Sequence, residues 1–166
     1  MSWSFIRGIT TFSPLTVALA NVAGCSTPSP EDLEAKFAVT NPQALLKSGS
    51  TLTGGDLEGA FSLEMALNPN VAESTTIHVE KFALQSTSGD ALIDPIPLPV
   101  GSKVDQGLAS GDSARLDYSF QAPNLTSELV ASLCTGQVVY VATLNDSAQN
   151  RTKTVKSDAF SVSGCQ

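Results

Sequence analysis

The chain has 166 residues, of which 16 are acidic and 9 are basic, and its formal net charge is −7. An acidic chain without a basic stripe argues against nucleic acid and anionic lipid head groups as partners. With one histidine and three cysteines, the chain also offers few soft ligands for zinc.

The first 24 residues have the pattern of a secretory signal. Arg7 is the only charged residue before Glu31, and a mostly apolar run follows it from Gly8 to Val22. This run is about 15 residues long, whereas a helix that spans a bilayer needs about 20. We therefore predict a helical signal peptide over residues 1–24, not a permanent transmembrane helix.

The apolar run ends on Val22-Ala23-Gly24-Cys25, which resembles the lipobox of bacterial lipoproteins. The resemblance covers only the first 25 residues. It implies that Cys25 becomes the mature N-terminus and carries a diacylglycerol thioether, usually with an added N-acyl chain. Each buried methylene contributes about 0.8 kcal/mol, so two or three acyl chains would hold the protein on a lipid bilayer. Cleavage after Ala18-Leu19-Ala20 is the alternative, and it leaves Cys25 as a plain thiol.

The residue after this cysteine, Ser26, resembles the outer-membrane sorting signal of enteric bacteria. We expect a lipid-anchored protein of the bacterial cell envelope, at the outer membrane and facing the periplasm or the surface. Residues 25–34 continue with the polar, proline-containing stretch STPSPEDLE, which predicts a flexible, disordered tether. Residues 35–166 are predicted to form one domain with a substantial hydrophobic core.

Short alternating segments within residues 35–166 predict an all-β, antiparallel fold of seven strands. The predicted strands are Lys36–Thr40, Ala60–Leu67, Thr76–Gln85, Ile93–Val100, Ala114–Gln121, Gln137–Leu144 and Thr152–Ser163. The leucines of Leu125–Leu133 recur every four residues and predict a short helix that crosses between two sheets. The strand number and spacing resemble immunoglobulin-like or fibronectin-type sandwiches in architecture alone, because no Cys-Trp-Cys arrangement is present.

Four of these strands carry further predictions. In Ala60–Leu67, the apolar side chains at every second position from Phe61 to Leu67 are predicted to point to one face. The apolar positions of Thr76–Gln85 change parity near Glu80-Lys81, which predicts a β-bulge there. Three prolines restrict Ile93–Val100 to an edge strand or an extended crossover. Gln137–Leu144 is apolar on both faces and is predicted to be central.

Three cysteines leave one odd thiol in an exported protein. If Cys25 carries lipid, Cys134 and Cys165 remain as a pair. Facing each other across the last hairpin, they would centre its turn between residues 149 and 150, close to the loop predicted at Asn145–Asn150. We therefore predict that a Cys134–Cys165 disulfide closes the last hairpin in an oxidising compartment.

The stretches LNPN and VEKFALQSTSGD resemble the water-stress and hypersensitive-response domain of late-embryogenesis-abundant proteins. In that domain too, Asn-Pro-Asn ends one strand, and an apolar strand and a glycine turn follow. The resemblance implies the same sandwich class, and it makes protection of other proteins under stress an alternative function.

The search for catalytic residues finds no nucleophile with a nearby base. The only histidine, His78, lies between Ile77 and Val79 and is expected to face solvent. We therefore predict no enzyme and no cofactor. Two carboxylates suffice for glycoside hydrolysis, so a hydrolytic domain stays an alternative even though no cleft-lining aromatic residues accompany the acids.

Calcium needs only oxygen ligands. The candidate ligands are the loop acids Asp90, Asp94, Asp105 and Asp112. Two of them belong to Ser88-Gly89-Asp90 and Ser110-Gly111-Asp112, which are also ordinary turn formers. We favour turns at these positions and keep a calcium-dependent polysaccharide-binding or hydrolytic domain as the alternative. The main expectation is a membrane-anchored envelope lipoprotein that presents its sandwich as a binding or structural module for an envelope protein or polysaccharide.

Overall fold

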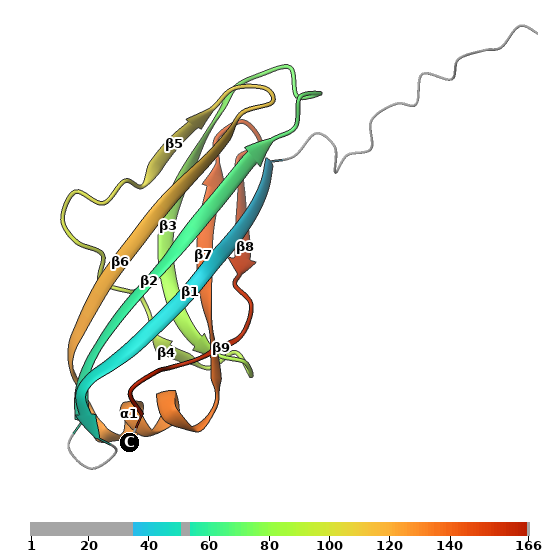
Figure 1. The fold of residues 1–166 in the computed structure, drawn as a ribbon. Coiled ribbons are helices and arrows are strands. Elements are labelled where there is room, and N and C mark those ends of the chain that lie inside the picture. The colour runs from blue at the N-terminus through green and yellow to red at the C-terminus, as the bar shows by residue number, and fades with distance from the viewer. Residues whose placement is uncertain (1–34, 51–53, 166) are drawn as a thin grey trace, which may run out of the picture.

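The computed structural model describes residues 35–50 and 54–165, which form two antiparallel β-sheets and one helix (Figure 1). In chain order the elements are β1 (Ala35–Ser50), β2 (Gly54–Leu67), β3 (Thr75–Ser86), β4 (Ala91–Ile93), β5 (Asp105–Leu108), β6 (Ser113–Leu125), α1 (Ser127–Thr135), β7 (Gln137–Asp146), β8 (Arg151–Lys156) and β9 (Phe160–Ser161). Within these two ranges, no helix is long and apolar enough to cross a membrane. The predicted signal peptide, Cys25 and the predicted tether lie outside the described residues.

The two sheets pack face to face as an all-β sandwich. The first has the strand order β1-β2-β6, and the second has the order β4-β3-β7-β8, with β5 paired to β3 and β9 paired to β7. In chain order, β1, β2 and β6 take the places of strands A, B and E of an immunoglobulin sandwich, while β3, β7 and β8 take those of C, F and G. The predicted fold class is confirmed.

The described residues contain nine strands, not the predicted seven. The strand that was missed, β5, has four residues and contains Gly107, too short a stretch to show an alternating pattern. The predicted strand Thr152–Ser163 is divided at Ser157, whose hydroxyl accepts a hydrogen bond from the backbone N–H of Tyr140 at 3.0 Å. A side chain there takes the place of a backbone carbonyl and interrupts the ladder.

The first strand is much longer than the predicted Lys36–Thr40. The predicted strand ends just before Asn41-Pro42, but the pairing of β1 with β2 shifts its register between Thr40 and Gln43, shifts again before Ser50, and extends to that residue. Asn41 adopts a φ of 51°, a conformation that asparagine tolerates, and the strand continues past this bulge.

Other local predictions are confirmed. The register between β3 and β7 shifts between Val79 and Lys81, so Glu80 is the bulged residue. The predicted helix is α1, which begins after the cap residue Thr126, connects the two sheets and buries Val130 and Leu133. Strand β7 is central, with β3 on one side and β8 and β9 on the other. Of the segment Ile93–Val100, only Ile93 belongs to a strand, the edge strand β4, and the rest is a crossover.

Four aromatic rings from both sheets form the centre of the core. Phe61 of β2 lies 4.5 Å from Tyr140 and 4.7 Å from Phe82 between ring centroids, and Phe82 lies 4.7 Å from Tyr118. Phe61 is 2% exposed, which confirms the predicted inner face of β2. These contacts between opposite sheets hold the two layers in a defined register.

Both tyrosines of the chain belong to this cluster and satisfy their hydroxyl groups internally. Tyr118 donates to the carbonyl oxygen of Lys103 at 2.7 Å, and Tyr140 donates to the carbonyl oxygen of Gln43 at 2.7 Å. Burial raises the pKa of Tyr118 to about 12, and it raises the pKa of Tyr140 as well. Both side chains therefore stay neutral donors at physiological pH.

The C-terminal segment closes one side of the sandwich against β1. Isolated parallel bridges join Val39 to Ser157 and Leu45 to Ser163. Leu46 donates its N–H to the carbonyl of Ser163 at 2.8 Å, and Ser163 donates to the carbonyl of Ala44 at 2.9 Å. The edge of β1 is thus paired, whereas β6 forms the other edge of the same sheet.

Candidate functional site

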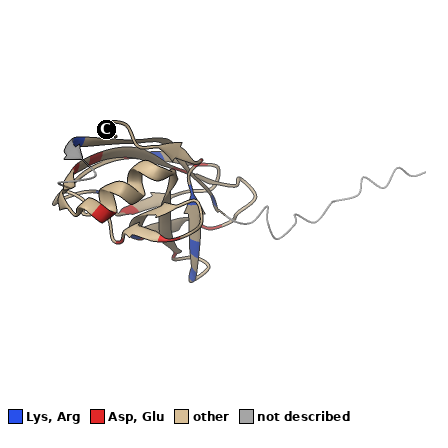
Figure 2. Cartoon of the chain, turned by 90° about the horizontal axis from the view of Figure 1, so that it is seen from below, with Lys and Arg blue, Asp and Glu red and all other residues tan. Residues whose placement is uncertain are grey.

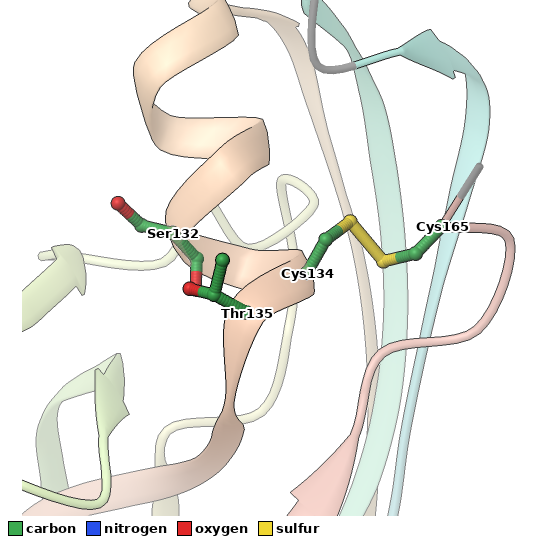
Figure 3. The surroundings of a disulfide bond; sticks show 4 residues. All are labelled: Ser132, Cys134, Thr135 and Cys165. Atoms are coloured by element: carbon green, nitrogen blue, oxygen red, sulfur yellow. A yellow bond between two sulfur atoms is a disulfide. The ribbon is translucent and has the colours of Figure 1, made fainter.

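The predicted disulfide is present between Cys134 and Cys165, with a Cα–Cα distance of 5.6 Å (Figure 3). Its position differs from the prediction in one respect. Cys134 lies on α1, so the bond joins the end of the helix to the C-terminal segment and does not close the β7–β8 hairpin itself. Observed pairs such as Val141 with Lys156 centre that hairpin between residues 148 and 149, close to the predicted turn.

The four candidate calcium ligands have separate partners. Asp90 accepts hydrogen bonds from the hydroxyl groups of Ser86 and Ser88, at 3.2 and 2.7 Å. Asp94 forms an ion pair with Lys81 at 2.9 Å. Within the described ranges, no group of three or more His, Cys, Asp or Glu side chains could hold a metal ion.

The remaining two candidates lie at opposite ends of β5 and the turn that follows it. Asp105 begins the strand and contacts the Nδ1 atom of His78 at 2.7 Å, while Asp112 accepts the N–H of Ala109 at 3.0 Å. Gly89 and Gly111 have φ values of 99° and 78°. Both Ser-Gly-Asp tripeptides are therefore turns, as predicted.

His78 is exposed, as the sequence predicts, with 51% of its side chain accessible. Its hydrogen bond to Asp105 joins β3 to β5 at the last pair of their ladder. This arrangement fastens a short edge strand to the sheet. Among the described residues, no serine, threonine or cysteine side chain forms a hydrogen bond with His78.

A groove of about 990 Å³ lies on the three-stranded sheet. It is lined by Pro42, Gln43, Ala44, Leu45, Glu58, Gly59, Ala60, Pro97, Leu98, Pro99, Val100, Ser119, Phe120, Gln121, Phe160, Ser161 and Ser163. The lining contains both large hydrophobic side chains that are exposed in the described part of the chain, Leu45 (42%) and Val100 (107%). Both exposed side chains thus lie at the border of the same groove.

The groove is almost uncharged. Glu58 is its only charged lining residue, and Lys47 holds one of its carboxylate oxygens at 2.6 Å while Gln121 donates to the other at 3.1 Å. Of the two phenylalanines in the lining, Phe120 is 2% exposed, and Phe160 is half-buried and stacks on Tyr140 at 5.0 Å between ring centroids. The lining therefore consists of apolar and uncharged polar side chains and one paired carboxylate.

A polar cluster occupies the outer face of the same sheet. Arg115 donates from Nε to Asp117 at 2.9 Å and from Nη2 to the hydroxyl of Ser62 at 2.8 Å, and Ser62 in turn donates to Asp117 at 2.6 Å. Hydrogen bonding from Ser62, and then from Arg115, lowers the pKa of Asp117. The hydrogen bond and charge of Asp117 raise the pKa of Arg115. The network keeps both side chains charged and in place on the sheet surface.

Sequence reasoning missed the main features of this sheet surface. The groove combines residues from β1, β2, β6, the 97–100 segment and the C-terminal segment, and no local pattern links them. The sequence also led us to place Asp146 in a loop. In the structure, Asp146 ends β7, is 3% exposed and accepts a hydrogen bond from the N–H of Ala148 at 3.0 Å. A buried aspartate at a strand end gives no signal in the sequence beyond that of an ordinary turn former.

No protein-family model matches the chain, and no curated protein matches its sequence. Among solved structures, the chain is similar to the ApaA protein of Bordetella pertussis, with 10% identity and a TM-score of 0.43 over 79% of this chain and 94% of that one. It is also similar to the structural genomics target SoR45, with 6% identity and a TM-score of 0.32 over 78% of this chain and 87% of that one. At these scores neither likeness adds to the description of fold or function.

Proposed function

We propose that the chain is a lipid-anchored protein of the bacterial cell envelope whose sandwich binds a partner protein. The observation that carries the anchor is the use of the three cysteines. Cys134 and Cys165 bond to each other, which leaves Cys25, at the end of the lipobox-like sequence, as the remaining cysteine. A disulfide between the other two fits an exported protein.

The position of Ala35 supports a particular arrangement of the anchored domain. The ten residues from Cys25 to Glu34 span at most about 35 Å. Ala35 begins β1 at the end of the sandwich opposite α1, and the 16 residues of β1 extend about 50 Å from it (Figure 1). The end with α1 and the disulfide is thus the part of the domain most distant from the attachment point.

The lining of the groove indicates the kind of partner that would bind there. It lies in the half of the sheet toward α1, because its β1 residues, Pro42–Leu45, come after the bulge. With one neutralised carboxylate and the exposed side chains of Leu45 and Val100, it fits an extended, uncharged polypeptide segment. Seen from below, both acidic and basic residues occur along several elements of the ribbon (Figure 2).

Substitution of the lipobox cysteine tests the anchor. The full chain and its Cys25→Ala variant are expressed in a bacterium that processes lipoproteins, and the N-terminal peptide is analysed by mass spectrometry after membrane fractionation. We expect an acylated N-terminus at Cys25 in the wild type and an uncleaved or unmodified chain in the variant. Cys165→Ala is the control and should keep the acyl group. An unmodified N-terminus elsewhere in the wild type would refute the anchor.

Photo-crosslinking from position 100 tests the groove. A photoreactive amino acid in place of Val100 should form adducts with a defined, uncharged segment of an envelope protein, identified by mass spectrometry. Leu45→Asp, which puts a charge into the same groove, should reduce the yield, and Glu73→Asp in an exposed loop outside the lining should not. Adducts with glycan, or a yield that Leu45→Asp leaves unchanged, would contradict the assignment.

A further inference from the structure

Strand β6 has an edge that no strand of the described residues occupies. It pairs with β2 along one side, and the described residues contain no strand paired to its other side. The opposite edge of the same sheet, β1, is covered by its bridges to Ser157 and Ser163. Because no described strand bonds to this side of the 13-residue strand β6, its backbone can serve as a template for another strand.

The hydrogen-bond register shows which residues of β6 present this row. Leu67 donates to the carbonyl of Asp112 at 2.9 Å, just before β6 begins. The pairing of β2 with β6 then runs without a shift from Ala66–Ser113 to Leu57–Ala122. Because bonding alternates in an antiparallel ladder, the even-numbered residues of β6 bond to β2 and the odd-numbered residues direct their N–H and C=O groups to the open side.

Two odd-numbered residues carry opposite charges. Arg115 and Asp117 lie on the outer face with 51% and 71% of their side chains exposed. In an antiparallel pair of two β6 strands centred on Leu116, Arg115 of one copy lies directly opposite Asp117 of the other, and the reverse pair forms by symmetry. The edge strand β8 is different, since its charged residues, Arg151, Lys153 and Lys156, all have the same sign and would repel a second copy.

The inner face of β6 adds an apolar contribution at the same place. Tyr118, Phe120 and Ala122 are 2–6% exposed, but Ala114 and Leu116, which face the same side, are only partly buried. Thus the apolar side chains left partly uncovered lie at the proposed centre of symmetry. A second copy of the strand would cover them.

From this edge, we infer that the chain forms a two-fold symmetric dimer in which β6 pairs antiparallel with β6 of a second copy, centred on Leu116. The two three-stranded sheets then become one continuous six-stranded sheet. Arg115 contacts the partner's Asp117, and the backbone groups of these two residues bond to each other. Leu116 and the partner's Leu116 form a pair without backbone hydrogen bonds between them, so their Cα atoms lie about 4.5 Å apart.

This geometry permits a sharp crosslinking test in the full chain. Leu116→Cys places two thiols opposite each other across the symmetry axis, and expression in an oxidising compartment should give a covalent dimer on a non-reducing gel. Ala114→Cys is the matched control, because it is also partly buried on the same face but lies opposite the partner's Tyr118. The proposal is overturned if Leu116→Cys gives no dimer while the protein is folded, or if both variants give dimer equally.

Charge exchange provides a second test that does not need a new cysteine. The dimer fraction of the full chain in a non-ionic detergent is measured by sedimentation over a range of concentrations. Arg115→Asp should weaken association about tenfold, because a carboxylate at position 115 then lies opposite the partner's Asp117 in each of the two symmetric pairs. The double variant R115D/D117R should restore association. Lys47→Glu, on the far strand β1, changes the charge equally and should have no effect.

Melting of each variant at low protein concentration separates loss of pairing from loss of the fold, because Arg115 also contacts Ser62 within the chain. A wild type that stays monomeric at the highest concentration measured, or an Arg115→Asp variant that associates as strongly as the wild type, would show that the β6 edge does not pair.

Discussion

Gly59 shows how closely single residues are packed in this sandwich. A Cβ atom at this position would overlap the ring of Phe120 and the hydroxyl group of Tyr140. We expect Gly59→Ala to lower the free energy of unfolding by about 1–3 kcal/mol, because the buried rings cannot move aside without strain. Gly107→Ala, in β5, has no atom within 4 Å of the added Cβ and is the control. Equal denaturation midpoints for the two variants would contradict the prediction.

The two tyrosines give a residue-scale prediction of pH dependence. Burial raises the pKa of Tyr118 to about 12 from an ordinary value of 10.0, and the pKa of Tyr140 is raised as well. Because the pKa of Tyr118 is higher in the folded state than in the unfolded state, burial of the neutral side chain favours the folded state. This contribution to stability is complete below pH 10 and is lost as the pH rises from 10 toward 12.

Absorbance at 295 nm measures this ionisation directly, since the chain without its first 24 residues has no tryptophan and only these two tyrosines. We expect little phenolate at pH 11 in the folded protein, and mostly phenolate at the same pH in denaturant. A folded-state titration with its midpoint near pH 10 would mean that the rings are not buried as described.

At the scale of elements, the disulfide holds the C-terminal segment against the first sheet. It joins α1 to residue 165, and the neighbouring Ser163 forms two backbone hydrogen bonds with β1. Replacing both cysteines, Cys134→Ala with Cys165→Ala, should lower the free energy of unfolding by about 3–4 kcal/mol, because the unfolded chain regains the freedom of a loop of about 32 residues.

Hydrogen exchange would show which part of the domain loses stability when the disulfide is removed. The amides of Leu46 and Ser163 should lose protection first. The amide of Val79, which lies in the second sheet and donates to the carbonyl of Val104, should serve as an unaffected reference. Uniform loss of protection over both sheets would contradict a local role for the bond.

At the scale of the whole molecule, the first described residue, Ala35, is already buried in the core, and residues 25–34 are predicted to be a flexible tether. We therefore expect cleavage by a glutamate-specific protease at Glu31 or Glu34 to release a fragment that melts at the temperature of the uncut protein. Mass spectrometry identifies the fragment, and calorimetry gives its melting temperature. A melting temperature lowered by several degrees would show that residues 1–34 contribute to the folded domain.

The sequence by itself determined the features that depend on neighbouring residues. Alternation placed Phe61 inside, the change of parity located the bulge at Glu80, and leucine spacing identified α1. Cysteine parity identified the disulfide partners. These signals are visible because each strand or helix buries one face, and the period of the pattern is the period of the backbone.

Only the tertiary structure decided what depends on distant segments. The continuation of β1 past Asn41-Pro42 is set by its ladder with β2, and the break at Ser157 is set by the bond to Tyr140. The groove and the free edge of β6 exist because strands far apart in sequence lie side by side. Pairing between distant strands leaves no period in either one, so a single sequence cannot show it.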